Sequence, residues 1–226
     1  IIKNYEAPMK DKAGFLVLRS NFFDTAIMKM SVVSEEFKKR YLSDNEHPMQ
    51  FTARAIVFDG PEHYHNEINN PKLNIDENCI LIIRGCGPIG YPGSAEVVNM
   101  QPPDHLLKKG ISALPCLGDG RQSGTSESAS ILNVSPEAAA GGKIAIIKNN
   151  DLVKVDLIEK RVDVMIDQST IDERMQKIQF KFPANQTPWQ EIARNYVGQL
   201  SDGACLNTKE EYFDVSKTKG VPRDSH

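Results

Sequence analysis

Twice in this 226-residue chain a short apolar run leads directly into a glycine-rich segment. The first run, 79–83, is continuously apolar and far too short to span a bilayer, so it predicts a strand that is buried on both faces. The second run, 111–117, predicts another strand. Loops that follow strands on a rigid scaffold are common places for binding and catalytic residues. The glycine-rich segments 84–97 and 118–126 are therefore the candidate functional loops.

The remaining hydrophobic pattern predicts many short strands with helices between them. Strands are expected over 15–19, 25–30, 51–58, 143–148, 152–157 and 161–166. Helices are expected over 34–42, 61–69 and 102–110, and further helices are expected to start near residues 135, 169 and 187. The last three strands are separated by short polar turns and predict a meander of hairpins. This content favours a mixed α/β fold, a closed or two-layered β structure flanked by helices, over a doubly wound parallel sheet.

The charge pattern excludes several classes of partner. The formal net charge is -3, and basic and acidic residues are interspersed, so neither nucleic acid nor a membrane is an expected partner. The four cysteines lack C-x-x-C spacing, which disfavours a cluster built from them alone, and Cys79 and Cys116 are expected to be buried free thiols. His63 and His65 are expected on one helix but on different faces, exposed and without a metal.

The second glycine-rich loop holds the strongest candidate for chemistry, Ser123. Glycines and successive backbone N–H groups in such a turn can form a nest that favours an anion. Its polar side chains are Asp119, Arg121, Ser123, Thr125 and Ser126, with Arg121 expected to be buried. The segment matches neither a phosphate-binding loop nor the G-x-S-x-G elbow, and no His–Asp pair is evident for a serine hydrolase. A tight turn whose hydroxyls cap backbone groups explains the residues equally well.

The first glycine-rich loop offers one candidate metal ligand, Glu96. A carboxylate just after such a loop can bind a hard cation such as Mg²⁺. An acidic residue in the first turn of a short helix, stabilised by the helix dipole, accounts for the same position. From the residues alone, the helix interpretation is favoured.

Three spaced motifs, 86–96, 118–125 and 135–142, together resemble the dihydroxy-acid dehydratase/phosphogluconate dehydratase family. Segments 95–103, 189–191 and 197–200 and the last five residues are similar to the sugar-acid branch, which acts on D-xylonate, L-arabinonate and other aldonates. The resemblance covers nearly the whole chain. It implies a hydro-lyase that removes water from an aldonate and gives a 2-keto-3-deoxy sugar acid.

The resemblance also implies roles for individual residues. Ser123 matches the base that removes the proton next to the substrate carboxylate, and Thr125 matches a neighbouring hydroxyl directed toward the substrate. Glu96 matches a carboxylate that helps to hold Mg²⁺, while Arg121 and His226 match substrate-binding positions. The ligands of the family's iron–sulfur cluster belong to an N-terminal domain, so none of the four cysteines here is expected to bind it.

For the fold, the resemblance implies a β-rich domain over 1–182, similar to the swivelling domain of aconitase-like enzymes, and a helical or irregular extension over 183–226. The chain, which begins without Met, is interpreted as the C-terminal part of a longer cytoplasmic enzyme that forms dimers or tetramers. By itself it is expected to be inactive. The alternatives are a dihydroxy-acid dehydratase of branched-chain amino-acid synthesis, a non-catalytic swivel-like binding module or subunit, and an unrelated serine hydrolase.

Overall fold

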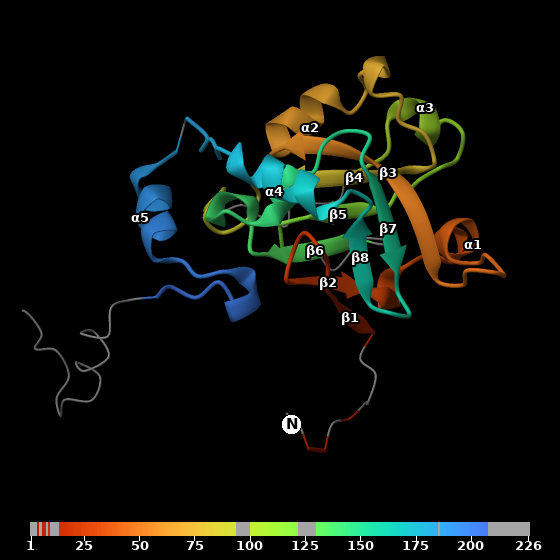
Figure 1. Ribbon diagram of the computed structural model, residues 1–226, viewed down its shortest axis with the longest axis horizontal. Coiled ribbons are helices and arrows are strands. Elements are labelled where there is room, and N and C mark those ends of the chain that lie inside the picture. Colours follow the sequence, from red (N-terminus) through yellow and green to blue (C-terminus); the bar gives the residue numbers. More distant parts are fainter. Residues whose placement is uncertain are drawn as a thin grey trace, which may run out of the picture.

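The structure of the chain, a computed structural model, describes residues 14–93, 100–121, 130–184 and 186–207, and residues 4, 6, 7 and 9 near the N-terminus. In these parts eight strands form one sheet with the order β1-β2-β6-β5-β4-β3-β7-β8 (Figure 1). The strands are β1 Phe15–Leu18, β2 Thr25–Lys29, β3 Gln50–Asp59, β4 Cys79–Arg84, β5 Cys116–Gly118, β6 Ser130–Ser135, β7 Leu152–Asp156 and β8 Arg161–Val164. The α-helices of the same parts are α1 Glu35–Tyr41, α2 Pro61–Glu67, α3 Asp104–Leu107, α4 Gln168–Gln176 and α5 Pro188–Tyr196.

The centre of the sheet is parallel and its two flanks are antiparallel. Strands β3, β4, β5 and β6 pair side by side in parallel, whereas β2 and β7 pair antiparallel to the outer two of them. The expectation of a β-rich structure flanked by helices is confirmed, and the middle of its sheet is a parallel layer. Because parallel strands end at the same edge, the segments that follow these four strands meet at one end of the sheet.

The two edge strands approach each other and nearly close the sheet into a barrel. Arg19, just after β1, donates its N–H to the carbonyl of Lys160 over 3.0 Å, and Val162 in β8 donates to the carbonyl of Arg19 over 2.9 Å. Asn21 adds side-chain hydrogen bonds to both backbone groups of Val164. The expected mixed α/β fold with a closed β structure is therefore observed as a nearly closed, eight-stranded barrel.

Strand β4 lies between two hydrophobic layers, as its continuous apolar run predicts. Ile80 and Ile82 belong to the larger cluster, inside the barrel, with side chains from β2, β6, β7 and β8. Leu81 and Ile83 point to the opposite face and pack in a second cluster with Leu106 of α3 and with the partly buried Tyr64 of α2. Alternate residues of a strand face opposite sides, so a strand covered on both sides has no polar position.

Helix ends follow the expected capping chemistry with one change. Ser34 caps α1 through its hydroxyl, and Thr187 and Gln190 form a capping box at the start of α5. Helix α4 starts earlier than expected, because the carboxylate of Asp167, rather than Ser169, accepts the N–H of Thr170. His63 and His65 are exposed on α2, as expected.

Two sequence predictions fail around β6. The segment 143–148, expected as a strand, holds a short 3-10 helix, Lys143–Ile146, and only β7 and β8 form the expected hairpin. The helix expected from Ser135 is a single 3-10 turn, Ala138–Ala140, which Gly141 ends with φ 83°. Strand β6 itself was not predicted. Its side chains pack in both hydrophobic clusters, one on each face of the sheet. The run 131–134 is too short to show such a pattern in the sequence.

Candidate functional site

Both glycine-rich loops start at the same end of the barrel. Ile83, near the end of β4, is in register with Gly118 at the end of β5, so the two loops leave the sheet side by side. A Cβ at Gly118 would lie 2.7 Å from the Ile83 side chain, and this close approach explains the glycine. In open parallel sheets, ligands usually bind beyond the carboxyl ends of the strands. The end of the barrel from which the two loops start is therefore the candidate site.

Four of the expected site residues, Glu96, Ser123, Thr125 and His226, lie outside the described residues. The described parts end at Gly93 in the first loop and at Arg121 in the second, and so give the starting points of both. Arg121 is described and exposed, so the expectation that it is buried is wrong.

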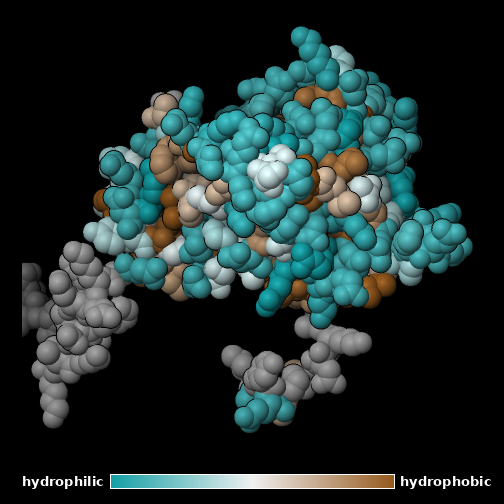
Figure 2. Space-filling view, in the orientation of Figure 1, coloured by the Kyte–Doolittle hydropathy of each residue, from teal (hydrophilic) through white to brown (hydrophobic). Residues whose placement is uncertain are grey.

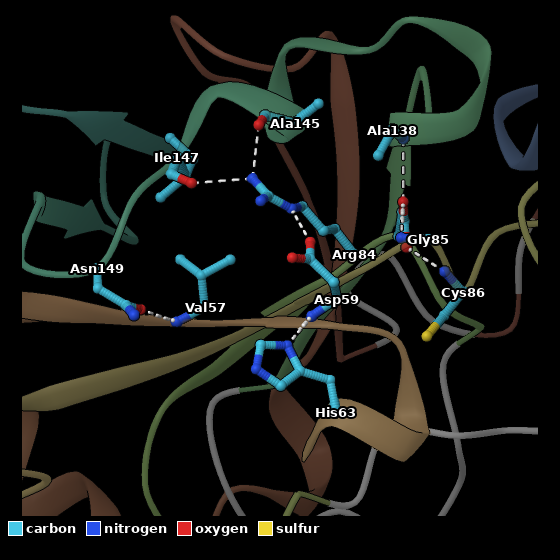
Figure 3. Close-up of polar contacts among 11 residues, drawn as sticks. Val57, Asp59, His63, Arg84, Gly85, Cys86, Ala138, Ala145, Ile147 and Asn149 are labelled. Carbon is cyan, nitrogen blue, oxygen red and sulfur yellow. Dashed lines mark hydrogen bonds and ion pairs between the residues drawn. The ribbon is translucent and has the colours of Figure 1, made fainter. Parts of the chain in front are cut away.

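The best-defined polar group at this end is the fully buried carboxylate of Asp119. Oδ2 accepts the backbone N–H of Gly85 over 2.9 Å and that of Ala138 over 3.0 Å, and Oδ1 accepts the N–H of Cys86 over 2.8 Å. Figure 3 shows Gly85, Cys86 and Ala138 converging on this point. One side chain thus joins the segments that follow β4, β5 and β6.

A second buried carboxylate, Glu137, continues this arrangement. Oε1 accepts the N–H of Ile89 over 2.9 Å and Oε2 accepts that of Gly90 over 2.8 Å. The amide of Gln199 completes the contacts, because Nε2 donates to Oε1 over 2.9 Å while Oε1 of Gln199 accepts the N–H of Glu137 over 2.8 Å. Glu137 therefore fastens the first loop to the end of β6 and to the segment after α5.

Burial raises the pKa of both carboxyl groups above their ordinary values. For Asp119 the loss of water is opposed by the N–H groups of Ala138, Cys86 and Gly85, which favour the ionised form. For Glu137 burial is again the largest cause of the raised pKa, and the nearby charge of Asp119 adds to it. Neither group is open to a ligand, since every contact is with the protein's own N–H groups.

The C-terminal part of the described chain holds the first loop from the outside. In α5, Arg194 donates Nε–H to the carbonyl of Ile89 over 2.8 Å, and Gln190 donates to the carbonyl of Pro92 over 3.0 Å. The Arg194 guanidinium also lies 4.3 Å from the centre of the Phe182 ring. Residues 89–92, which precede Glu96 in the chain, are thus fixed on both sides.

A cavity of about 460 Å³ lies beside these loops, between the ends of β3 and β4 and the segment 178–183. Arg84 lines it, with Nε 2.5 Å from Oδ1 of Asp59 and with hydrogen bonds to the carbonyls of Ala145 and Ile147 (Figure 3). Tyr91 donates its hydroxyl to Glu62 at the same cavity. Arg84 and Asp59 carry opposite charges, so this ion pair adds no net charge to the cavity.

The cysteines behave as the sequence predicts. Cys79, Cys86 and Cys116 are buried free thiols, and Cys205 is an exposed one. Burial raises the pKa of Cys79 to about 11 and raises that of Cys86 further. Within the described ranges, no group of three His, Cys, Asp or Glu side chains is placed to hold a metal ion. The same ranges contain no helix that is both long and apolar enough to cross a membrane.

Sequence reasoning passed over the two residues that organise this end of the barrel. Asp119 was considered only as a polar member of a turn, and Glu137 only as part of a helix start. A signal did exist, because each acidic residue stands at the end of an apolar run, next to glycine or alanine residues. A carboxylate in such a place must be paired or hydrogen-bonded when it is buried.

Comparison with known proteins identifies the family. The dihydroxy-acid/6-phosphogluconate dehydratase C-terminal family profile matches residues 1–204. The chain belongs to this family. It is 55% identical over its whole length to D-xylonate dehydratase of Caulobacter vibrioides, of which it covers 38%. It is 33% identical over its whole length to L-arabinonate dehydratase of Rhizobium leguminosarum, of which it covers 37%.

The family resemblance predicted from the three motifs is thereby confirmed. A dihydroxy-acid dehydratase of Methanococcus maripaludis is 31% identical over 91% of the chain, which covers 35% of that protein. The chain thus spans little more than a third of the length of these relatives. All three are named dehydratases, so the enzymatic class expected from the motifs, a hydro-lyase, is that of the family.

Proposed function

We propose that this chain is the C-terminal part of an aldonate dehydratase that acts on D-xylonate or a similar pentonate. The observation that carries the proposal is the 55% identity to D-xylonate dehydratase, which extends over all 226 residues. The identity to L-arabinonate dehydratase is much lower at 33%, and this favours the xylonate-like members. The product would be a 2-keto-3-deoxy sugar acid.

In the proposed reaction Ser123 is the base. Its oxygen, as alkoxide, takes the proton from C2, next to the substrate carboxylate. The C3 hydroxyl leaves with a proton as water, and the resulting enol tautomerises to the 2-keto acid. Thr125 and the exposed Arg121 bind the substrate beside Ser123, and His226 is a further substrate contact. Backbone N–H groups of the glycine-rich turn favour the negative charge on the serine oxygen.

The cofactors of the proposal are Mg²⁺ and an iron–sulfur cluster. Bound together, they would polarise the substrate carboxylate and hydroxyl groups and assist departure of the C3 hydroxyl. Glu96 is the one Mg²⁺ ligand proposed in this chain. The remaining ligands of both cofactors are proposed to lie in the rest of the longer protein.

The rest of the polypeptide is the proposed partner of this chain, in an enzyme that forms dimers or tetramers. Helix α5 supports this, because its inner face contacts the first loop while Trp189, Ile192 and Tyr196 remain 78%, 49% and 45% exposed. Apolar side chains are visible over this region at the left of the molecule in Figure 2. A stripe of this kind is typical of an interface. We propose that it packs against the preceding domain.

The expected division of the chain remains part of the proposal. Residues 1–182 would form a swivel-like domain, and 183–226 would form an extension that reaches the neighbouring domain. The enzyme would act in the cytoplasm, where free thiols such as those of this chain persist.

The test uses the full-length protein, reconstituted with iron, sulfide and Mg²⁺. Formation of 2-keto-3-deoxy acid is measured with D-xylonate, L-arabinonate and D-gluconate, for the wild type and for Ser123→Ala. We expect D-xylonate to give the highest kcat/KM and Ser123→Ala to lose activity by at least about 100-fold. The 226-residue chain alone should be inactive, and turnover by it would contradict the proposal.

A second candidate is a dihydroxy-acid dehydratase of branched-chain amino-acid synthesis, which the 31% identity to the archaeal relative favours. The same assay distinguishes the two when a branched dihydroxy acid is added to the substrates. Turnover of that acid without turnover of any aldonate would establish the second candidate and exclude the first.

A further inference from the structure

We infer that Asp119 and Glu137 are positioning residues, whose buried carboxylates set the start of the Ser123 loop against the start of the Glu96 loop. The inference rests on the proposed function for the roles of Ser123 and Glu96. The contacts themselves are properties of the described structure. Neither carboxylate is a catalytic residue, because both are fully buried and bonded to backbone N–H groups.

The first step is the place of Asp119 in the chain, four residues before Ser123. Its backbone belongs to the second loop, while its side chain accepts N–H groups from Gly85 and Cys86, at the start of the first loop. The same carboxylate accepts the N–H of Ala138 after β6. Any shift of the Ser123 loop start relative to β4 must therefore break buried hydrogen bonds to a charged acceptor, which are among the stronger ones in proteins.

The second step is the place of Glu137, which holds residues 89 and 90 of the first loop. It accepts the N–H groups of Ile89 and Gly90, and Gln199 links it to the segment after α5. The fit is tight, because a Cβ at Gly87 would lie 2.3 Å from Oε2 of Glu137. From this fixed turn the chain continues through Gly93 toward Glu96.

The third step is energetic. Burial disfavours the ionised form of both carboxyl groups, so they are costly as elements of stability alone. An apolar contact would hold strands together at less cost, but it would not orient three peptide N–H groups toward one point. A carboxylate can orient these N–H groups, because it holds two acceptor oxygens in one rigid group. Such orientation matters for catalysis because small displacements of reacting groups lower reaction rates strongly.

The test replaces each carboxylate by its isosteric amide in the full-length protein. Asp119→Asn and Glu137→Gln each place an NH₂ group against a backbone N–H, so at least one hydrogen bond is lost and two donors face each other. We expect kcat with D-xylonate to fall by roughly 10- to 100-fold while KM changes less than about threefold. For Asp119→Asn, the isotope effect with C2-deuterated substrate should rise, because proton removal by a displaced Ser123 becomes more rate-limiting.

The matched control is Val162→Ala, in the barrel interior at β8 and away from both loops. It should lower the denaturation midpoint by as much as the amide variants or more, with unchanged kcat and isotope effect. Equal loss of kcat in Val162→Ala, or unchanged kcat in both amide variants, would overturn the inference.

Amide hydrogen exchange separates this inference from the proposed function. Without reference to turnover, Asp119→Asn should speed exchange over 85–93 and 119–129, whereas Val162→Ala should not. If the wild type turns over no aldonate but these loops are loosened, the proposed function fails and the positioning role stands. Unchanged exchange over both loops in the amide variants would reject the positioning role whatever the activity.

Discussion

Single residues determine the geometry at the loop end of the barrel. Asp119 and Glu137 each gather backbone N–H groups from loops that are distant in sequence, and in both the pKa is raised by burial. In both groups, hydrogen bonds from N–H groups favour the ionised form and oppose the effect of burial on the pKa. Two consequences can be measured on the 226-residue chain.

The first concerns pH. Because the pKa of Asp119 is raised in the folded chain, the folded state binds more protons than the unfolded state between the ordinary and the raised pKa. The unfolding free energy contributed by this group therefore increases as the pH falls through that window. Asn at this position does not titrate. The stability of the wild type relative to Asp119→Asn, from denaturant titrations between pH 7 and 4, should rise toward low pH. A difference that shrinks would refute the raised pKa.

The second concerns the contact between Gly87 and Glu137. A methyl group at position 87 would meet the Glu137 carboxylate, so Gly87→Ala should lower the unfolding free energy by about 1–3 kcal/mol. Glu137→Ala removes the carboxylate that the methyl group meets. The loss of unfolding free energy in the double variant should be smaller than the sum of the losses in the two single variants. Strict additivity would count against the contact.

Secondary-structure elements set which groups solvent can reach. Strands β4 and β5 lie between the barrel interior and the layer of α2 and α3, and the cysteines in and next to these strands are buried. Cys205 follows α5 and is exposed. The elements therefore divide the four thiols of the chain into one reactive and three protected groups.

A thiol titration of the native chain at pH 8 should accordingly find one fast-reacting cysteine. Cys79 combines burial with a pKa of about 11, so it supplies almost no thiolate at this pH. Cys205→Ser should abolish the fast phase, and denaturant should release the other three thiols in both chains. Two or more fast thiols in the native chain would mean that β4 and β5 are less well covered than described.

The whole barrel depends on the contact between its first and last strands. The Asn21 side chain exchanges two hydrogen bonds with the backbone of Val164, and the backbone N–H of Asn21 donates to Oδ1 of Asp163 over 2.9 Å. Without this junction β1 and β8 would be two open edges, which natural sheets protect. Asn21 and Val164 are 143 positions apart in the sequence, so this contact exists only in the folded chain.

Removal of this junction should lower the stability of the whole barrel. Asn21→Ala should lower the unfolding free energy by about 1–3 kcal/mol, since two buried backbone groups of Val164 lose their side-chain partners. Amide exchange should increase in β1 and β8 together. Asn45→Ala, at an exposed position, is the control and should change neither. Faster exchange in β8 alone would indicate that the barrel is not closed through Asn21.

The sequence by itself determined the local features of this protein. The run 79–83 predicted a strand buried on both faces, the caps at Ser34 and Thr187 predicted the starts of α1 and α5, and three motifs identified the family. These signals are local because periodicity, capping and motif chemistry each depend on residues within a few positions of one another.

Only the tertiary structure decided the pairing of strands and the roles of the buried acids. Segment 143–148 has the apolar pattern of a strand but packs as a 3-10 turn, and β6 becomes a strand because β2 and β5 offer it partners. Asp119 and Glu137 resembled ordinary turn residues, since their hydrogen-bond donors lie 19 to 62 positions away. Hydrogen bonds over such separations leave no periodic trace in the sequence, so the arrangement of the loop end could be known only from the fold.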